Sequence, residues 1–235
     1  MGSEAEQPQA GHPAFGARTV VAPASPAFPA GPFSLVLVDP PWAFRTFNRA
    51  RATPTSKQFR EGEDHYPTMT FDEMAALPVS AACAKDAVLA MWVVGSHLDE
   101  ALRLGAAWGF SYTTDLFCWM KQKLRGADQL DLFTGDIAEP RISMGYYTRK
   151  QKEDCLLFTR GRGLPVMAHD VRQVIVAPAT EHSRKPAEQY ARIERLFGID
   201  QGAVVPRLEM FARSSAPGWS AWGNEVGKFD AQVAA

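Results

Sequence analysis

The sequence lacks the features that mark membrane, secreted and metal-binding proteins. No window of 18 apolar residues occurs in the 235-residue chain, so no transmembrane helix is expected. The N-terminus has neither the basic start nor the apolar centre of a secretory signal. The three cysteines, Cys83, Cys118 and Cys155, are far apart and fit no metal-binding spacing. We therefore expect reduced cysteines inside a cytoplasmic protein, and no metal site.

The chain also lacks an excess of charge of either sign. Its 25 Lys and Arg residues nearly balance its 26 Asp and Glu residues, which gives a formal net charge of −1. The global field therefore does not favour a polyanion, and nucleic-acid binding would have to come from a local patch. The glycine-rich G-x-G-x-x-G motif of dinucleotide-binding folds is missing as well.

Most of the chain shows the alternation of an α/β domain. Residues 1–31 are rich in Ala, Pro and Gly without an amphipathic period, which predicts a flexible N-terminal tail before a domain over 32–235. Apolar runs in that domain are typical of buried strands. The predicted strands cover residues 33–38, 87–94, 113–121, 154–160, 172–177 and 207–213.

Two amphipathic segments between these runs predict helices over 96–109 and 185–198. Gly109 and Gly198 suit their C-terminal ends. Alternating strands and helices predict a mostly parallel sheet with helices on both faces. The predicted buried side chains of the two helices are Leu98, Ala101, Leu102, Ala106, Tyr190, Ile193, Leu196 and Phe197.

The stretch "LVLVDPPWAF" ends the first predicted strand on Asp39, where a parallel sheet binds its ligands. An Asp-Pro pair is an ordinary turn, but Trp42 adds a stacking face for a planar ring. A carboxylate and a proline carbonyl can each accept one hydrogen of an exocyclic amine, which aims the nitrogen lone pair at an electrophile. We therefore predict catalytic roles for Asp39, Pro40, Pro41 and Trp42.

This motif and seven further blocks, in the same order, resemble the MT-A family of adenine-N6 methyltransferases. The other blocks are "HYPTMTFDEM", "LAMWVVG", "CWMK", "MGYYTRKQKEDCLLFTRG", "EHSRKPAEQYARIERLFG", "RLEMFAR" and "PGWSAWGNE". The resemblance runs from about Phe33 to Gly227 and includes the family's permuted motif order. It implies a Rossmann-like class I methyltransferase fold that uses S-adenosylmethionine and methylates the N6 amine of adenine.

The resemblance also implies which residues bind the cofactor. Lys185 matches the family lysine at the junction of cofactor and substrate. The end of the last predicted strand and the loop after it match the part that holds the ribose and methionine groups. Glu225 stands where some relatives have glutamine. The implied cofactor-binding residues are Lys185, Arg213, Ser214, Asn224 and Glu225, with His182 and Ser183 on the loop before Lys185.

Three further positions match residues near the acceptor nucleoside in the family. Tyr66 matches a tyrosine of the loop that closes over the target base, and Glu153 matches a glutamate beside the nucleoside. Lys121 matches a lysine at a strand end. Without the resemblance, Tyr66 is an aromatic packed on the core and Glu153 is a surface charge.

Two basic segments predict a nucleic-acid surface. Residues 43–60 contain no Asp or Glu, and phenylalanines alternate with their basic side chains, so phosphate contacts and stacking faces occur together. A solvated loop is the alternative, but we expect a mobile lid or substrate clamp. The basic residues of this segment are Arg45, Arg49, Arg51, Lys57 and Arg60, and those of the second segment are Arg141, Arg149, Lys150 and Lys152.

The leading hypothesis is therefore adenine-N6 methylation of nucleic acid. DNA is favoured because the sequence shows no attached RNA-binding module, and RNA stays open. A non-catalytic scaffold subunit is a second hypothesis, against which the intact Asp39 motif argues. A protein-amide methyltransferase is disfavoured because such enzymes carry asparagine at the first motif position. A homodimer or a helper subunit is expected, because the family often pairs two similar domains.

Overall fold

The computed structural model describes residues 26–42, 68–122, 141–143, 147–179 and 184–230. Within them, seven strands form one sheet in the order β5-β3-β4-β2-β1-β6-β7. Every strand runs parallel to the others except β4, which is antiparallel to β2 and β3. The predicted α/β fold is thus confirmed. The strands are β1 (Phe33–Val38), β2 (Cys83–Val93), β3 (Ser111–Gln122), β4 (Lys152–Arg160), β5 (Val174–Pro178), β6 (Arg207–Met210) and β7 (Ser220–Trp222).

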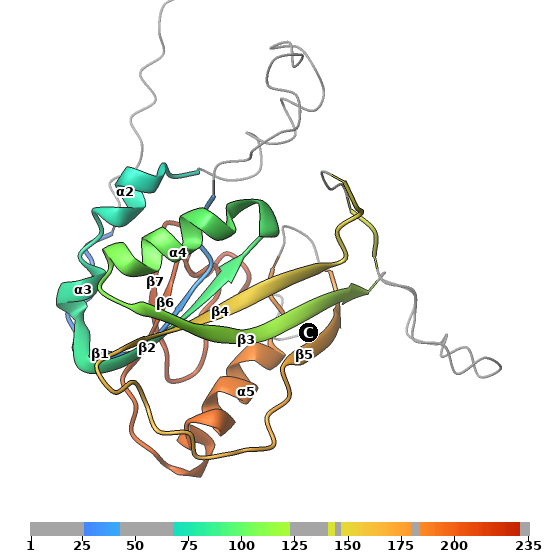
Figure 1. Cartoon of the computed structure of the whole chain (residues 1–235). Helices are drawn as coiled ribbons and strands as arrows, with labels where there is room; N and C mark the ends of the chain where they lie inside the picture. Colours follow the sequence, from blue (N-terminus) through green and yellow to red (C-terminus); the bar gives the residue numbers. More distant parts are fainter. Residues whose placement is uncertain (1–25, 43–67, 123–140, 144–146, 180–183, 231–235) are drawn as a thin grey trace, which may run out of the picture.

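Helices cover both faces of this sheet (Figure 1). On β1, Val36 and Val38 belong to the hydrophobic cluster that includes α4, whereas Leu35 and Leu37 belong to the cluster that includes α5. A strand buried on both faces needs a continuous apolar run, which explains why β1 was readable from the sequence. The helical elements are α2 (Phe71–Ala75), α3 (Val79–Ala82), η1 (Gly95–His97), α4 (Leu98–Ala107), α5 (Glu188–Leu196) and η3 (Ile199–Gln201).

The predicted buried face of α4 was wrong. Only Ala101 of the predicted set is buried, while Leu98 and Leu102 are 45% and 37% exposed. The helix instead turns Leu104 and Gly105 toward the sheet. A Cβ on Gly105 would lie 2.4 Å from Cε1 of Phe158 on β4, so the missing side chain allows the close approach. The apolar face identified from the sequence was therefore the neighbouring one.

The boundaries of α5 and β6 also differ from the predictions. Helix α5 begins at Glu188, so Lys185 and Pro186 precede it and do not form its first turn. Its N-cap residue Ala187 has no side chain that can cap the helix. Strand β6 ends at Met210 because the next residue, Phe211, adopts a left-handed backbone with a φ of 57°. The predicted apolar stripe of α5 is confirmed, and it buries Ile193 and Phe197.

The first described residues pack on the domain. The ring of Phe28 lies 4.9 Å from that of Trp222 on β7, and the carbonyl of Pro26 accepts the Trp222 indole N–H at 2.9 Å. Pro26 and Phe28 fall within the predicted tail over 1–31. The first 25 residues of that tail lie outside the described part. Strand β7 was not predicted, because three residues are too few for a readable pattern. In the described ranges no helix has the length and apolarity needed to cross a membrane.

Candidate active site

Four charged side chains meet at the carboxyl end of β1. Asp39 directly follows β1, and its Oδ2 lies 2.7 Å from Nζ of Lys185. The same ammonium lies 3.2 Å from Oε2 of Glu153 on β4, whose other oxygen pairs with Lys121 of β3. A line of alternating charges thus joins residues that the sequence predicted separately as catalytic, cofactor-binding and substrate-binding.

The ion pairs of Lys185 and Glu153 are buried, so they strongly affect the pKa values of both groups. The Lys185 and Glu153 side chains are only 10% and 8% exposed. Burial alone would lower the pKa of Lys185, but Asp39 and Glu153 outweigh it and raise that pKa above the ordinary lysine value. Burial would likewise raise the pKa of Glu153, but Lys185 and Lys121 hold it below its usual value. Lys185 and Glu153 therefore both stay ionised at neutral pH.

The Asp39 carboxylate keeps one oxygen that no described side chain binds. Its Oδ2 accepts from Lys185, and the side chain is 31% exposed, so Oδ1 can accept a hydrogen from an incoming group. The next carbonyls are both engaged, because Pro40 O accepts from Trp42 N at 2.8 Å and Pro41 O accepts from Met69 N at 3.0 Å. Each carbonyl oxygen retains a second lone pair.

Trp42 does not offer the exposed stacking face that the sequence predicted. It is 7% exposed and belongs to the hydrophobic cluster on the α4 side of the sheet. Its ring stacks on that of His97, with 5.5 Å between centroids and 23° between planes. After the two prolines, the backbone of Trp42 forms an isolated parallel bridge with Met69. Its Nε1 is buried and has no hydrogen-bond partner among the described residues.

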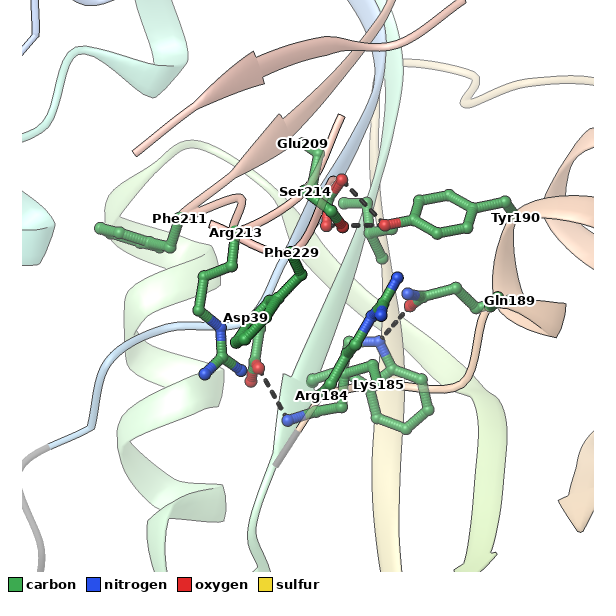
Figure 2. A pocket seen from close by; sticks show the side chains of 13 residues that line it. Asp39, Arg184, Lys185, Gln189, Tyr190, Glu209, Phe211, Arg213, Ser214 and Phe229 are labelled. Carbon is green, nitrogen blue, oxygen red and sulfur yellow. Dashed lines mark hydrogen bonds and ion pairs between the residues drawn. The ribbon is translucent and has the colours of Figure 1, made fainter. Parts of the chain in front are cut away.

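A pocket opens beside Asp39, between the carboxyl ends of β1 and β6 and the start of α5 (Figure 2). Its empty volume is about 510 Å³, which includes space that is open to solvent. Four residues predicted from the sequence line it, namely Asp39, Lys185, Arg213 and Ser214. The lining residues that the sequence reasoning did not select as site residues are Leu37, Trp92, Arg184, Ala187, Gln189, Tyr190, Glu209, Phe211 and Phe229.

Glu209 was the most informative omission. It is a single acid in the apolar run "RLEMF", and it pairs in register with Leu37 of the central strand β1. The Tyr190 hydroxyl on α5 donates to the carboxylate, with 2.9 Å to each oxygen. Burial raises the pKa of Glu209 to about 7, with a further contribution from Asp39. The sequence could have indicated Glu209 as a site residue, because it is an acid inside the strand that pairs with β1.

Aromatic and cationic side chains form the other side of the pocket. Phe211 follows β6 with its left-handed backbone, and Gly223 approaches it so closely that a Cβ there would lie 3.0 Å from the Phe211 carbonyl carbon. The Phe229 ring has the guanidinium carbons of Arg184 and Arg213 each 5.7 Å from its centre. Figure 2 shows the ring between the two arginines.

The remaining predicted residues lie elsewhere. Asn224 is exposed in the turn before Phe229, and Glu225 beside it pairs with Lys228 at 2.6 Å, so neither lines the pocket. In the second basic segment, Lys152 pairs with Asp154 at 2.8 Å. The predicted residues that lie outside the described ranges are Tyr66, His182, Ser183, Arg45, Arg49, Arg51, Lys57 and Arg60.

The same residues that build this site fall within a match to a known family. A family model described as MT-A70 matches residues 33–225, which is most of the chain. The chain belongs to the MT-A70 family. Curated relatives in this family are named as adenine- or adenosine-N6 methyltransferases, which confirms the family expected from the sequence.

Relatives of different kinds match nearly the same stretch of the chain. The type II methyltransferase M.MunI of Mycoplasma sp is 28% identical over 86% of this chain and 81% of its own length. The N6-methyladenosine RNA methyltransferase MTA1 of Cryphonectria parasitica is 29% identical over 84% of this chain but 52% of its own length. The human N(6)-adenine-specific methyltransferase METTL4 is 24% identical, and the match covers 38% of it.

The pocket fits the methyl donor that the family implies. S-adenosylmethionine carries a sulfonium and an ammonium, for which Glu209 offers a carboxylate, and a carboxylate, for which Arg184 or Arg213 offers a cation. Its adenine ring could stack on the aromatic side chains Phe211 and Phe229, which line the pocket. Each charged group of S-adenosylmethionine thus has an oppositely charged side chain available in the pocket.

Proposed function

We propose that this protein is an S-adenosylmethionine-dependent methyltransferase that acts on the N6 amine of adenine in nucleic acid, with DNA favoured. The observation that carries the proposal is the Asp39 carboxylate at the end of β1, held by Lys185 at the edge of a charged pocket. Membership in the MT-A70 family supports the same reaction.

In this proposal Asp39 orients the nucleophile. Lys185 binds Oδ2, so Oδ1 accepts one amine hydrogen, and a proline carbonyl of the motif accepts the other with its free lone pair. These two bonds aim the nitrogen lone pair and stabilise the positive charge that develops on it. When bound, S-adenosylmethionine would supply a methyl group activated by its sulfonium. The methylated nitrogen then loses its proton to water, so no strong base is required.

The decisive experiment measures transfer of labelled methyl groups from S-adenosylmethionine to matched DNA and RNA oligonucleotides, with and without adenine. We expect label on adenine N6 in the purified wild type and none in Asp39→Ala. Circular dichroism should be unchanged in that variant, because the Asp39 side chain is partly exposed. Transfer by Asp39→Ala, or no transfer to any oligonucleotide by the wild type, would overturn the proposal.

The preference for DNA is supported by how the chain aligns with its relatives. It covers 81% of the type II methyltransferase M.MunI but 52% of the RNA methyltransferase MTA1. In duplex DNA the target base must leave the stack, which costs a few kcal/mol. The basic residues of 43–60 would bind the phosphates around it. Methylation of RNA alone in the experiment above would reverse this preference.

The proposal includes a cytoplasmic location and action as a homodimer or with a helper subunit. The free Cys83, Cys118 and Cys155 support a reducing compartment. Light scattering of the purified protein, alone and with an oligonucleotide, tests the oligomeric state. Titration with S-adenosylmethionine separates an enzyme from a scaffold subunit, because a scaffold need not bind it.

A further inference from the structure

His97 is a buried histidine that follows β2, next to the Asp39 motif. It is 4% exposed and ends η1, where its backbone N–H donates to the Val94 carbonyl at 2.8 Å. Strand β2 runs parallel to β1 and pairs with it up to Val38, so the segment after β2 lies at the same edge of the sheet as Asp39. Histidine is buried less often than apolar residues are, so a buried one at this edge is informative.

Two contacts fix the His97 ring. The ring stacks on the Trp42 indole, with 5.5 Å between centroids and 23° between planes, which is within the range of an offset aromatic stack. Its Nδ1 lies 3.1 Å from Ser96 Oγ, and Lys150 Nζ lies 3.4 Å from the same oxygen. Because an ammonium group can only donate, the Ser96 hydroxyl can give its proton to Nδ1 and hold the ring in one orientation.

The orientation of Trp42 in turn affects the carbonyls of the motif. The indole Nε1 is buried without a hydrogen-bond partner among the described residues, so the ring depends on packing contacts such as the stack on His97. The Trp42 backbone N–H donates to the Pro40 carbonyl at 2.8 Å, and the Pro41 carbonyl accepts from Met69 N at 3.0 Å. A displaced indole would therefore move the two carbonyls that follow Asp39.

We propose that His97 is a positioning residue, which holds Trp42 and thereby sets the direction of the proline carbonyl that accepts an amine hydrogen. The inference rests on the proposed function, in which this carbonyl and Asp39 together aim the nitrogen lone pair. His97 does not line the pocket beside Asp39, so it should affect turnover and leave cofactor affinity unchanged.

Steady-state kinetics of methyl transfer test this with His97→Ala, His97→Leu and His97→Phe. Phenylalanine keeps a planar ring that can stack on Trp42, whereas leucine fills space without one. We expect kcat to fall by about tenfold to a hundredfold in His97→Ala and His97→Leu, because small displacements of orienting groups have effects of this size. His97→Phe should largely restore kcat, and the Kd for S-adenosylmethionine should be unchanged in all three variants.

Two kinetic results would overturn the inference. Equal kcat in His97→Leu and His97→Phe would show that the side chain at this position only fills space. A loss confined to KM for the oligonucleotide would show that His97 contributes to substrate binding and not to the aim of the nucleophile.

The matched control for lost packing is Val79→Ala. Val79 is 1% exposed, begins α3 and belongs to the same hydrophobic cluster as Trp42. Because α3 precedes β2 and His97 follows it, Val79 lies at the other end of that strand. Val79→Ala should therefore lower the free energy of unfolding and leave kcat unchanged. A comparable loss of kcat in Val79→Ala and His97→Ala would contradict the positioning role.

Amide hydrogen exchange adds a readout that does not need activity. Pro40 and Pro41 have no amide hydrogen, so exchange in residues 40–42 reports the Trp42 N–H that donates to Pro40. Loss of the stack should speed this exchange by about three- to tenfold in His97→Ala and His97→Leu. His97→Phe and Val79→Ala should exchange as the wild type does. Unchanged exchange in His97→Ala would overturn the inference, whereas absence of methyl transfer by the wild type would instead refute the proposed function.

Discussion

Lys185 and Asp39 are 146 positions apart in the chain, yet their charged atoms lie 2.7 Å apart at the carboxyl end of β1. The lysine comes from the segment before α5, and the carboxylate comes from the end of the strand that α5 covers. Because Lys185 also pairs with Glu153, it fixes the distance between the two acids as well as their charge.

Replacing Lys185 by methionine should abolish activity and weaken the fold. Glu153 would keep only Lys121 as a partner, and removal of one partner from a buried ion pair costs about 3–5 kcal/mol. Methyl transfer should fall by on the order of a hundredfold or more, because Asp39 would lose its anchor. Urea unfolding and transfer assays measure the two effects.

The control for stability is Lys152→Met at the start of β4. Lys152 is 59% exposed and pairs with Asp154, so its loss should cost less than about 1 kcal/mol in urea unfolding. Equal losses in the two variants would show that Lys185 has no special role.

The free energy of unfolding should depend on pH through Glu209. Its pKa is about 7 in the folded protein against 4.5 for an ordinary glutamate, so the folded state holds a proton that the unfolded state has lost between these pH values. Stability from this group therefore falls as pH rises from about 4.5 to about 7, by on the order of 3 kcal/mol. Glu209→Gln should be stabilised relative to wild type more at pH 8 than at pH 5, which urea titrations can measure. A constant difference would mean that the carboxyl group titrates normally.

The fold could be predicted where the residue pattern of one strand was sufficient to identify that strand. The run before Asp39 is apolar on both faces, so it identified β1 without any knowledge of its neighbours. Helix α4 shows the limit, because its buried face depends on the contact between Gly105 and Phe158 on another strand. A periodicity on one helix cannot contain that information.

Some residues of the site could likewise be predicted from the sequence, and others could not. Asp39 and Lys185 belong to recognisable motifs and were predicted, whereas Glu209 looked like one acid in a strand. Only the register beside Leu37 and the contact with Tyr190 place it in the pocket. Trp42 was assigned an exposed role because its neighbour His97 could not be identified from the sequence.

Gly105→Ala should destabilise the protein although alanine favours helices. The new Cβ would meet the Phe158 ring at 2.4 Å, and overpacking of this kind costs about 1–3 kcal/mol. Gly95→Ala is the matched control, because its Cβ would have nothing within 4 Å. Thermal unfolding of both variants checks the expectation, which a stabilised Gly105→Ala would contradict.

The three thiols should differ in reactivity. Burial raises the pKa of Cys83 to about 11 and that of Cys155 well above the ordinary thiol value. Cys118 is raised by burial as well, but it is partly exposed. A disulfide reagent at pH 8 should therefore label Cys118 in the native protein, and the other two only after unfolding. Rapid native labelling of Cys83 or Cys155, read by peptide mass spectrometry, would contradict the described packing.

Substitutions of Trp42 can separate packing from direct contact with substrate. Because the indole N–H has no described partner and the ring stacks on His97, Trp42→Phe should keep transfer within about tenfold. Trp42→Ala leaves a cavity in the cluster and should cost about 3–5 kcal/mol in urea unfolding. A stacking wall for the base would give the opposite pattern, with stability nearly kept and KM for the oligonucleotide raised in both variants. Comparing the free energy of unfolding with KM in the same two proteins therefore decides whether Trp42 acts by holding Asp39 and its two prolines in place.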